Sequence, residues 1–244
     1  MTDTKHTQRP HLIKPGTFGL TVAADSRRGI FDAHNESLLA QNIAVDTVFI
    51  GDSITDMWAV DAYFRGTHGQ LVNRGIGADR TPFVRRRFAA DVVQLHPRLV
   101  IIMIGVNNFW DLDTWWDASL LRTPQAIETE IVDDITTMVK DALTNDIIVG
   151  LCSILPTNIP FNGNTAVRNE GIIRVNERTK HLAHELQNVT FIDYHRHFVA
   201  NDGLTLRAGL ADDGLHPHAP AYAIMTNILL ATLQEANISV LQAR

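Results

Sequence analysis

The sequence of 244 residues contains a single cysteine, Cys152. A lone cysteine excludes an intramolecular disulfide and argues against a metal site built from thiolates. Cys152 ends the apolar run 147–152, where a free thiol usually packs as a small hydrophobic side chain. We therefore expect Cys152 to be a buried core residue.

Long hydrophobic runs are also missing. The longest, residues 99–104, has the length of a strand and falls far short of the roughly 18 to 20 apolar residues that span a membrane. Residues 1–10 are polar and lack the apolar core of a signal peptide. These absences predict a cytoplasmic protein with no membrane span.

Positive charge is in deficit, because 21 lysines and arginines face 27 acidic residues for a formal net charge of −6. This balance argues against nucleic acid as a partner. The exception is Arg85-Arg86-Arg87, which we interpret as the solvated face of a helix. No repeat and no linker rich in Gly, Ser or Pro divides the chain. We expect one domain over residues 1–244, with residues 1–20 as a peripheral arm.

Short apolar runs alternate with segments of helical periodicity. The runs at 48–50, 71–72, 99–104, 147–152 and 189–192 are continuous rather than alternating, as in strands buried on both faces. Helices are predicted from Thr123-Pro124 onward, from about 169 to 186 and from about 219 to 235. This order predicts an α/β fold with a parallel sheet between layers of helices.

Ser53 is the one serine that follows a predicted strand and a glycine, in Gly51-Asp52-Ser53, and opens a predicted helix. Ligands of parallel α/β sheets bind beyond the carboxyl ends of the strands, and a helix N-terminus there can stabilise a developing oxyanion. Ser53 is therefore a candidate nucleophile. The alternative is that its hydroxyl only caps the helix.

A base for such a serine is available in Asp213-Gly214-Leu215-His216. A carboxylate three residues before an imidazole can orient the ring and fix its tautomer. The alternative is a surface loop in which Asp213 caps the helix that begins near His218. No G-x-S-x-G motif is present, which argues against the α/β-hydrolase fold.

Donors for an oxyanion follow two other strands. Asn107 could supply a side-chain N–H, and the turn 75–78 a backbone N–H. Gly75-x-Gly77 also suggests a dinucleotide-binding turn, although Arg80 replaces the third glycine of that motif. The pairs His195/His197 and His181/His184 could be metal ligands, but further ligands at suitable spacing are lacking.

Taken together, the blocks 51–54, 105–108 and 213–216 resemble those of the SGNH hydrolase superfamily, also called GDSL-type esterases and lipases. The resemblance runs from about residue 48 to residue 222. Many relatives have Asp at the position of Asn108, and Asn there resembles the group similar to platelet-activating-factor acetylhydrolase catalytic subunits. The resemblance implies a flavodoxin-like three-layer α/β/α sandwich with a five-stranded parallel sheet. It also implies a serine ester hydrolase, although relatives act on acetylated sugars, short-chain esters, lysophospholipids and thioesters. Among these we expect a short acyl or acetyl group as the substrate, and no metal or cofactor.

The resemblance assigns catalytic roles to Ser53 as nucleophile, His216 as general acid and base, and Asp213 as its orienting partner. The oxyanion hole would be formed by Ser53, Ala78 and Asn107. Ala78 stands where relatives usually have glycine; its backbone N–H suffices as a donor, but a positive φ would strain an alanine.

The substrate is less defined by the sequence. Three tryptophans, Trp110, Trp115 and Trp116, follow the Asn107 turn and could contact an acyl or sugar group, and Arg80 could meet a polar substrate. The alternatives are a packed loop or a subunit contact, so a homodimer stays open. Two other functions also remain: a nucleotide- or dinucleotide-binding domain, and a catalytically silent carbohydrate-binding relative.

Overall fold

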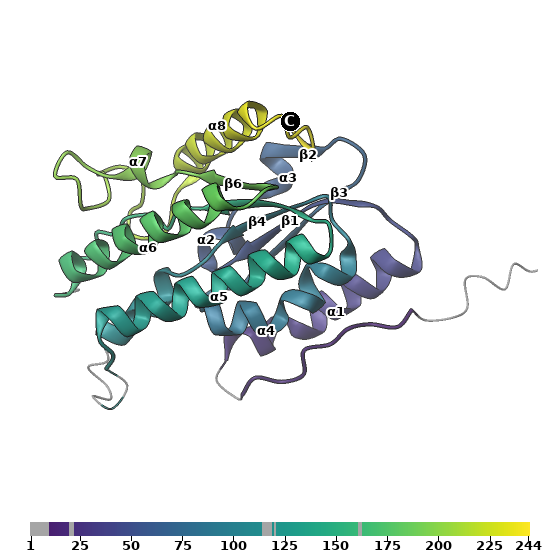
Figure 1. Ribbon diagram of the computed structural model, residues 1–244, viewed down its shortest axis with the longest axis horizontal. Helices are drawn as coiled ribbons and strands as arrows, with labels where there is room; N and C mark the ends of the chain where they lie inside the picture. Colours follow the sequence, from purple (N-terminus) through teal and green to yellow (C-terminus); the bar gives the residue numbers. More distant parts are fainter. Residues whose placement is uncertain (1–9, 20–21, 114–118, 120, 161–162) are drawn as a thin grey trace, which may run out of the picture.

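The centre of the structure, a computed structural model that describes residues 10–19, 22–113, 119, 121–160 and 163–244, is a five-stranded parallel sheet (Figure 1). The strand order is β3-β1-β4-β5-β6. The strands are β1 (Val45–Gly51), β3 (Gln70–Gly75), β4 (Leu99–Met103), β5 (Ile148–Cys152) and β6 (Val189–Ile192). All five coincide with the apolar runs of the sequence, so the predicted parallel sheet is confirmed.

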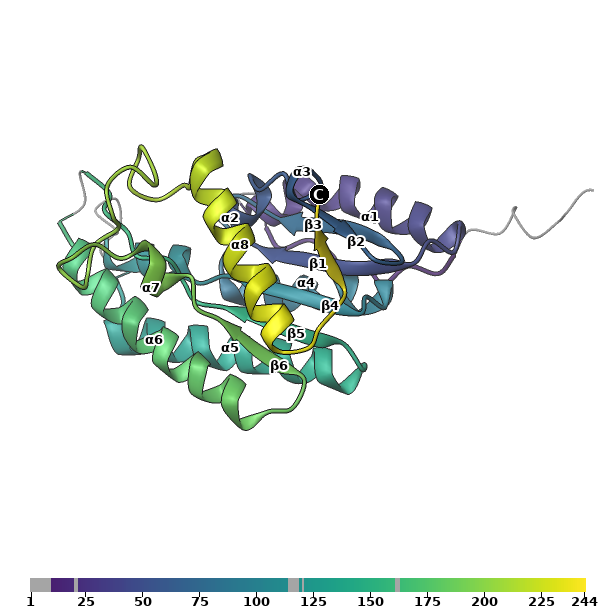
Figure 2. The same cartoon turned by 90° about the horizontal axis from the view of Figure 1, so that it is seen from above.

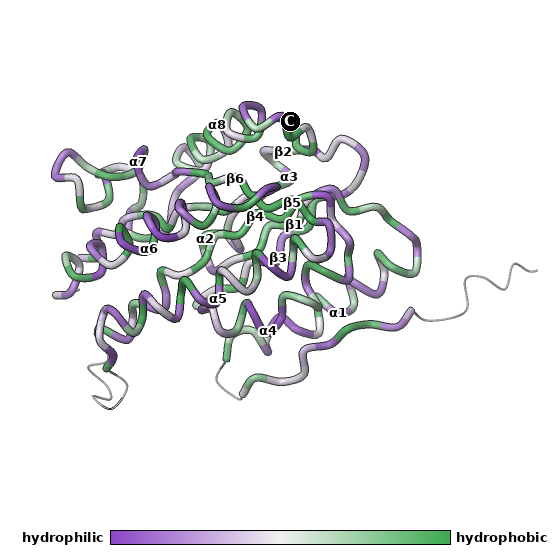
Figure 3. Tube along the Cα trace, viewed as in Figure 1, coloured by the Kyte–Doolittle hydropathy of each residue, from purple (hydrophilic) through white to green (hydrophobic). Residues whose placement is uncertain are grey.

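Continuous apolar runs are explained by burial on both faces of this sheet. Every residue of β1 and β4 is buried, and the strands form the hydrophobic centre of the molecule in Figure 3. Cys152 at the end of β5 is 4% exposed, and burial raises the pKa of its thiol. Cys152 is a core residue, as predicted.

Helices cover the two faces of the sheet. In Figures 1 and 2, α1, α4 and α5 lie on one side and α8 crosses the other, while α6 packs against α5 and β6. This confirms the three-layer α/β/α sandwich. These helices are α1 (Ala23–Ala40), α4 (Thr81–Asp91), α5 (Pro124–Thr144), α6 (Thr165–Glu185) and α8 (Ala219–Glu235).

The sequence defines the starts of the long helices to different degrees. α5 begins at Pro124, and the Thr123 hydroxyl accepts from the Ala126 N–H at 3.3 Å, so proline and cap act together. α8 has the predicted bounds, whereas α6 begins four residues before the predicted 169. α1 was not identified from the sequence; one of its four buried residues is the polar Asn35, which weakens its apolar stripe.

Shorter elements complete the described chain. β2 and β7 form a separate antiparallel pair that joins residues 64–66 to residues 241–243, and the sequence does not predict it. No described helix has the length and apolar content of a membrane span. The short elements are α2 (Ser53–Asp56), α3 (Val60–Tyr63), β2 (Phe64–Gly66), η2 (Val93–Leu95), η3 (Val106–Leu112), α7 (His195–Phe198) and β7 (Leu241–Ala243).

The N-terminal segment 10–19 lies along α4. The Ile13 N–H donates to Gln94 Oε1 at 2.8 Å, and Arg86 donates to the Thr17 carbonyl at 2.8 Å. The Arg86 guanidinium also lies 4.3 Å from the centre of the Phe18 ring. These contacts hold the described part of this arm against the body of the protein.

Candidate active site

Ser53 is the first residue of α2, directly beyond the carboxyl end of β1. The chain passes β4 so closely at Gly51 that a Cβ there would lie 2.1 Å from the Met103 carbonyl oxygen. The cap of α2 is Asp52, whose carboxylate accepts from the Ile54 N–H at 3.0 Å. The interpretation of Ser53 as a helix cap is therefore wrong, and its hydroxyl is free to point elsewhere.

The Ser53 hydroxyl meets His216 from the loop before α8. Ser53 Oγ lies 2.8 Å from His216 Nε2, and His216 Nδ1 lies 2.5 Å from Asp213 Oδ2. The second carboxylate oxygen of Asp213 accepts the backbone N–H groups of Leu215 and His216 at 2.9 and 2.8 Å. Three residues from two distant segments, predicted as a unit, thus form one hydrogen-bonded chain.

The charge on Asp213 is stabilised by this arrangement. Partial burial raises the pKa of Asp213, but hydrogen bonds from the His216 ring and from two backbone N–H groups outweigh it and lower the pKa to about 2. A carboxylate that stays ionised favours the tautomer with a proton on Nδ1, which leaves Nε2 as an acceptor towards Ser53.

The Asp213 loop is held by a turn that requires glycine. Gly214 has a φ of +76°, and a Cβ there would lie 1.9 Å from the Asn158 carbonyl oxygen. The Asn158 N–H donates to the Gly214 carbonyl at 2.8 Å, which joins the loop to the segment after β5. The N-cap of α8 is His218, and no side chain caps this helix end. Asp213 accepts instead from the Leu215 and His216 N–H groups, so its alternative role as the cap of α8 is wrong.

The turn after β3 lies beside Ser53. A Cβ on Gly77 would be 4.0 Å from Ser53 Cβ, so this turn approaches the serine without a side chain between them. Ala78 has a φ of +62°, a left-handed conformation that costs an L-residue roughly 1–2 kcal/mol. Asn107 from η3 donates through Nδ2 to the Asp79 carbonyl at 3.0 Å. Ser53, Ala78 and Asn107 therefore come together at one place.

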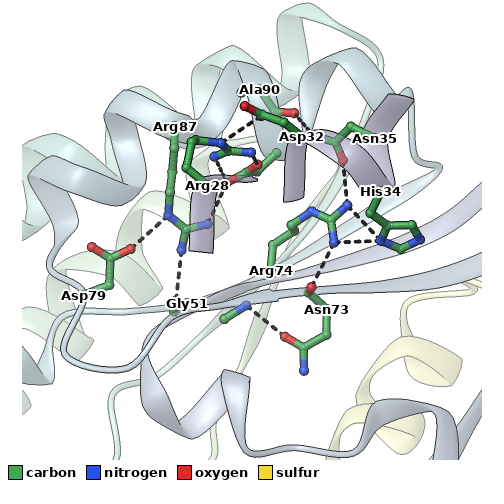
Figure 4. A network of polar contacts seen from close by, with 12 residues as sticks. Arg28, Asp32, His34, Asn35, Gly51, Asn73, Arg74, Asp79, Arg87 and Ala90 are labelled. Atoms are coloured by element: carbon green, nitrogen blue, oxygen red, sulfur yellow. Dashed lines mark hydrogen bonds and ion pairs between the residues drawn. The ribbon is translucent and has the colours of Figure 1, made fainter. Parts of the chain in front are cut away.

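Behind this turn lies the buried ion network of Figure 4. The Arg87 guanidinium donates to Asp79 at 2.9 Å, to Asp91 at 2.9 Å and to the Gly51 carbonyl at 3.1 Å. Arg28 of α1 holds the other side of Asp91 at 2.6 Å. The network joins α1 and α4 to the two strand ends that carry the site.

The Arg87 side chain is fully buried, so the interpretation of the three arginines as a solvated face is wrong at this position. Arg85 keeps half of its side chain exposed. Successive residues of a helix point about 100° apart, so the packing of α4 on the sheet decides which of the three arginines faces the core. The available signal was Asp79, a carboxylate eight residues upstream, but only the fold shows that the two meet.

A second buried arginine lies next to this network. Arg74 of β3 donates to Asn35 Oδ1 at 2.6 Å (Figure 4). Its guanidinium also lies 4.7 Å from the centre of the Phe31 ring. Burial lowers the pKa of Arg74 to about 10, against the opposing pull of the nearby Asp91 carboxylate. β3 is thereby fixed to α1 just before the oxyanion turn.

The candidate substrate residues have mixed outcomes. Arg80 forms an ion pair with Asp111 at 2.6 Å, which ties the turn after β3 to η3, and 29% of its side chain remains exposed. Trp110 donates through Nε1 to Asn107 Oδ1 at 3.1 Å. Trp115 and Trp116 lie outside the described residues.

Two alternative sites gain no support. Gly75 packs against α2, where a Cβ would lie 2.1 Å from the Asp56 nitrogen, so its role is close packing of β3 on α2. In the described parts of the chain, no three His, Cys, Asp or Glu side chains are grouped as metal ligands would be. His181 instead faces Glu185 on the exposed side of α6.

The chain matches the model of the GDSL-like lipase/acylhydrolase family over residues 49–224. It is 24% identical to an acetylxylan esterase of Geobacillus stearothermophilus over 206 residues, which are 75% of this chain and 91% of the relative. Among solved structures it resembles a protein assigned as an acylhydrolase in Bacteroides fragilis, with a TM-score of 0.70 and 25% identity over 88% of this chain and 99% of the other. A GDSL-like lipase of Bacteroides thetaiotaomicron has a TM-score of 0.66 and 24% identity over 84% and 98% of the two chains. The chain is thus a carboxylic ester hydrolase and belongs to the GDSL-like lipase/acylhydrolase family.

Proposed function

We propose that this protein hydrolyses esters of short acyl groups, acetyl above all, by transferring the acyl group first to Ser53 and then to water. The observation that carries the proposal is the chain of contacts from Ser53 Oγ through His216 to Asp213, at 2.8 and 2.5 Å. Serine is a poor nucleophile until a base takes its proton, and this geometry provides that base.

In the acylation step, Ser53 Oγ attacks the ester carbonyl carbon while His216 Nε2 takes the hydroxyl proton. The negative charge that forms on the carbonyl oxygen is stabilised by the Nδ2–H of Asn107 and by the backbone N–H groups of Ser53 and Ala78. The intermediate then collapses, the bond to the alcohol oxygen breaks, and His216 returns the proton to the departing alcohol.

In the deacylation step, water takes the place of the alcohol. His216 Nε2 removes a proton from the water as its oxygen attacks the acyl carbon, and the same donors stabilise the second oxyanion. The bond to Ser53 Oγ breaks, and the proton returns to Ser53, which releases the carboxylic acid and restores the free enzyme. Asp213 stabilises the charged His216 ring in both steps.

The acetyl preference is supported by the relatives. The curated relative is named an acetylxylan esterase, and two solved structures of such an enzyme are catalytic mutants in which a serine or an aspartate is replaced by alanine. An acetylated carbohydrate is therefore the first substrate to test, ahead of lipids and thioesters.

The test compares wild type with Ser53→Ala on p-nitrophenyl acetate, butyrate and octanoate, and on acetylated xylan and an acyl-CoA. We expect preference for acetate, covalent labelling of wild type by a fluorophosphonate, and a fall in kcat of roughly 10⁴- to 10⁶-fold in Ser53→Ala. Ser37→Ala, which changes an exposed serine of α1, is the matched control and keeps wild-type activity.

Two results would contradict the proposal. Substantial esterase activity in Ser53→Ala would remove the serine mechanism. Preference for octanoate would retain the mechanism and overturn the short acyl group.

A further inference from the structure

Trp110 and Asn107 are three residues apart on the 3₁₀ helix η3, where residues i and i+3 lie on the same side. The indole Nε1–H of Trp110 donates to Asn107 Oδ1 at 3.1 Å. Asn107 is 4% exposed, and Trp110 is partly buried against the core. The hydrogen bond therefore joins two residues that are close in sequence, and it is largely shielded from water.

The two polar ends of the Asn107 amide are each matched to a partner of opposite kind. Oδ1 faces the Trp110 N–H, which can only donate, and Nδ2 donates to the Asp79 carbonyl, which can only accept, at 3.0 Å. A rotated amide would set two donors against each other on one side and two acceptors on the other. The amide orientation is thus defined by both partners, and Nδ2 keeps one N–H for a third acceptor.

The indole itself is held from the side of α6. The Arg168 guanidinium lies 5.0 Å from the centre of the Trp110 ring, its side chain is 1% exposed, and it forms an ion pair with Asp113. A cation over the face of an indole is attracted to the ring, so Arg168 restricts its rotation. Trp110 is consequently a preorganised donor rather than a free aromatic side chain.

We propose that Trp110 is a positioning residue for catalysis: its N–H fixes the Asn107 amide so that the remaining Nδ2–H points at the oxyanion. The inference rests on the proposed function, because it assumes that Asn107 stabilises the charge on the substrate. It differs from a role of Trp110 in substrate contact, which would act on KM, since a misdirected oxyanion donor acts on the transition state and lowers kcat.

The test is a double-mutant cycle with p-nitrophenyl acetate, a substrate too small to need an extended aromatic surface. Trp110→Phe keeps a ring beneath Arg168 but removes the donor. We expect it to lower kcat roughly 5- to 30-fold with KM changed less than about twofold. Asn107→Ala should lower kcat by roughly 10²- to 10³-fold, and adding Trp110→Phe to it should cause no further loss.

Four results separate the hypotheses. A fall in kcat of the same size in the Asn107→Ala background, or a change in KM alone, would overturn the positioning role. Wild-type kcat in Asn107→Ala would instead refute the oxyanion role of Asn107 in the proposed function. If circular dichroism shows that Trp110→Phe does not fold, benzothienylalanine is placed at position 110, where it replaces the N–H by sulfur in a ring of the same shape. The same loss of kcat is then expected, and full activity of the benzothienylalanine variant would overturn the proposal.

Discussion

Arg87 and Asp79 form an ion pair with both side chains fully buried, Nε to Oδ2 at 2.9 Å, directly behind the turn that carries Ala78. The same guanidinium donates to the carbonyl of Gly51, two residues before Ser53. One side chain therefore connects the end of the nucleophile strand to the oxyanion turn. The relative position of Ser53 and Ala78 depends on it.

The two carboxyl groups that Arg87 contacts, Asp79 and Asp91, have pKa values shifted in opposite directions. Burial raises the pKa of Asp79 above its ordinary value even though Arg87 opposes it. Burial also acts on Asp91, but there Arg28 and Arg87 together outweigh it and lower the pKa. Removing Arg87 would leave Asp79 without its charged partner, because Arg28 reaches Asp91 instead.

Arg87→Met keeps most of the side-chain volume and removes the charge. We expect it to lower the free energy of unfolding by about 3–5 kcal/mol, since it leaves a buried carboxylate uncompensated, and to lower kcat as well. Urea denaturation monitored by circular dichroism measures the first effect. Arg85→Met, on the same helix with half of its side chain exposed, should cost less than about 1 kcal/mol. Equal losses in the two variants would contradict the role given to Arg87.

The five strands were predictable because burial on both faces demands continuous apolar runs, and Ser53 and Asn107 because each comes shortly after such a run. The Asp213/His216 pair was predictable from the spacing of a carboxylate three residues before an imidazole. Local sequence carries both kinds of information. The topology of a parallel sheet then brings the segments together.

The parts that escaped prediction depend on contacts between distant segments. The partner of Arg65 in β2 is Gln242 in β7, and the two strands have only three residues each, too few to show a period. Which of three adjacent arginines is buried depends on how α4 packs. The sequence also raised the question of a positive φ at Ala78, and only the backbone answers it.

Ala78→Gly should stabilise the protein. The left-handed φ of +62° is unfavourable for alanine and open to glycine, so we expect a gain of about 1 kcal/mol in the free energy of unfolding. The backbone N–H is retained, and kcat should stay within about twofold of wild type. Ala33→Gly, in the interior of α1, is the matched control and should lose about 1 kcal/mol. Urea titrations of both variants decide the point, and a loss of stability in Ala78→Gly would contradict it.

The raised pKa of the buried Asp52 carboxyl group predicts that the free energy of unfolding depends on pH. Burial raises its pKa to about 7, against the Ile54 N–H and with support from the Asp79 charge, whereas an unfolded chain has the ordinary value of 3.8. Between these values the folded chain holds a proton that the unfolded chain has released. The contribution of Asp52 to the free energy of unfolding is therefore complete below about pH 4. It falls by up to about 4 kcal/mol as the pH rises to 7 and above.

Asp52→Asn keeps an oxygen for the Ile54 N–H and cannot ionise, so this decline should disappear. The measurement is urea denaturation at pH 5, 6, 7 and 8. Asp61→Asn, at an exposed position of α3, should follow the wild-type curve. Parallel curves for wild type and Asp52→Asn would show that Asp52 does not titrate in this range.

Asp213→Asn separates the orientation of His216 from its presence. The amide oxygen can still accept the backbone N–H groups of Leu215 and His216, but an N–H now faces His216 Nδ1 in place of Oδ2. The ring then carries its proton on Nε2, where it donates to Ser53 and cannot take the serine proton. We expect kcat for p-nitrophenyl acetate to fall by roughly 10³- to 10⁴-fold with little change in KM.

Asp212→Asn, which changes the exposed neighbouring carboxylate, is the control, and its kcat should stay within about twofold of wild type. The stability cost of Asp213→Asn should be small, because 54% of the Asp213 side chain is exposed and solvent screens its charge. Similar kcat values in the two variants would mean that Asp213 does not orient His216.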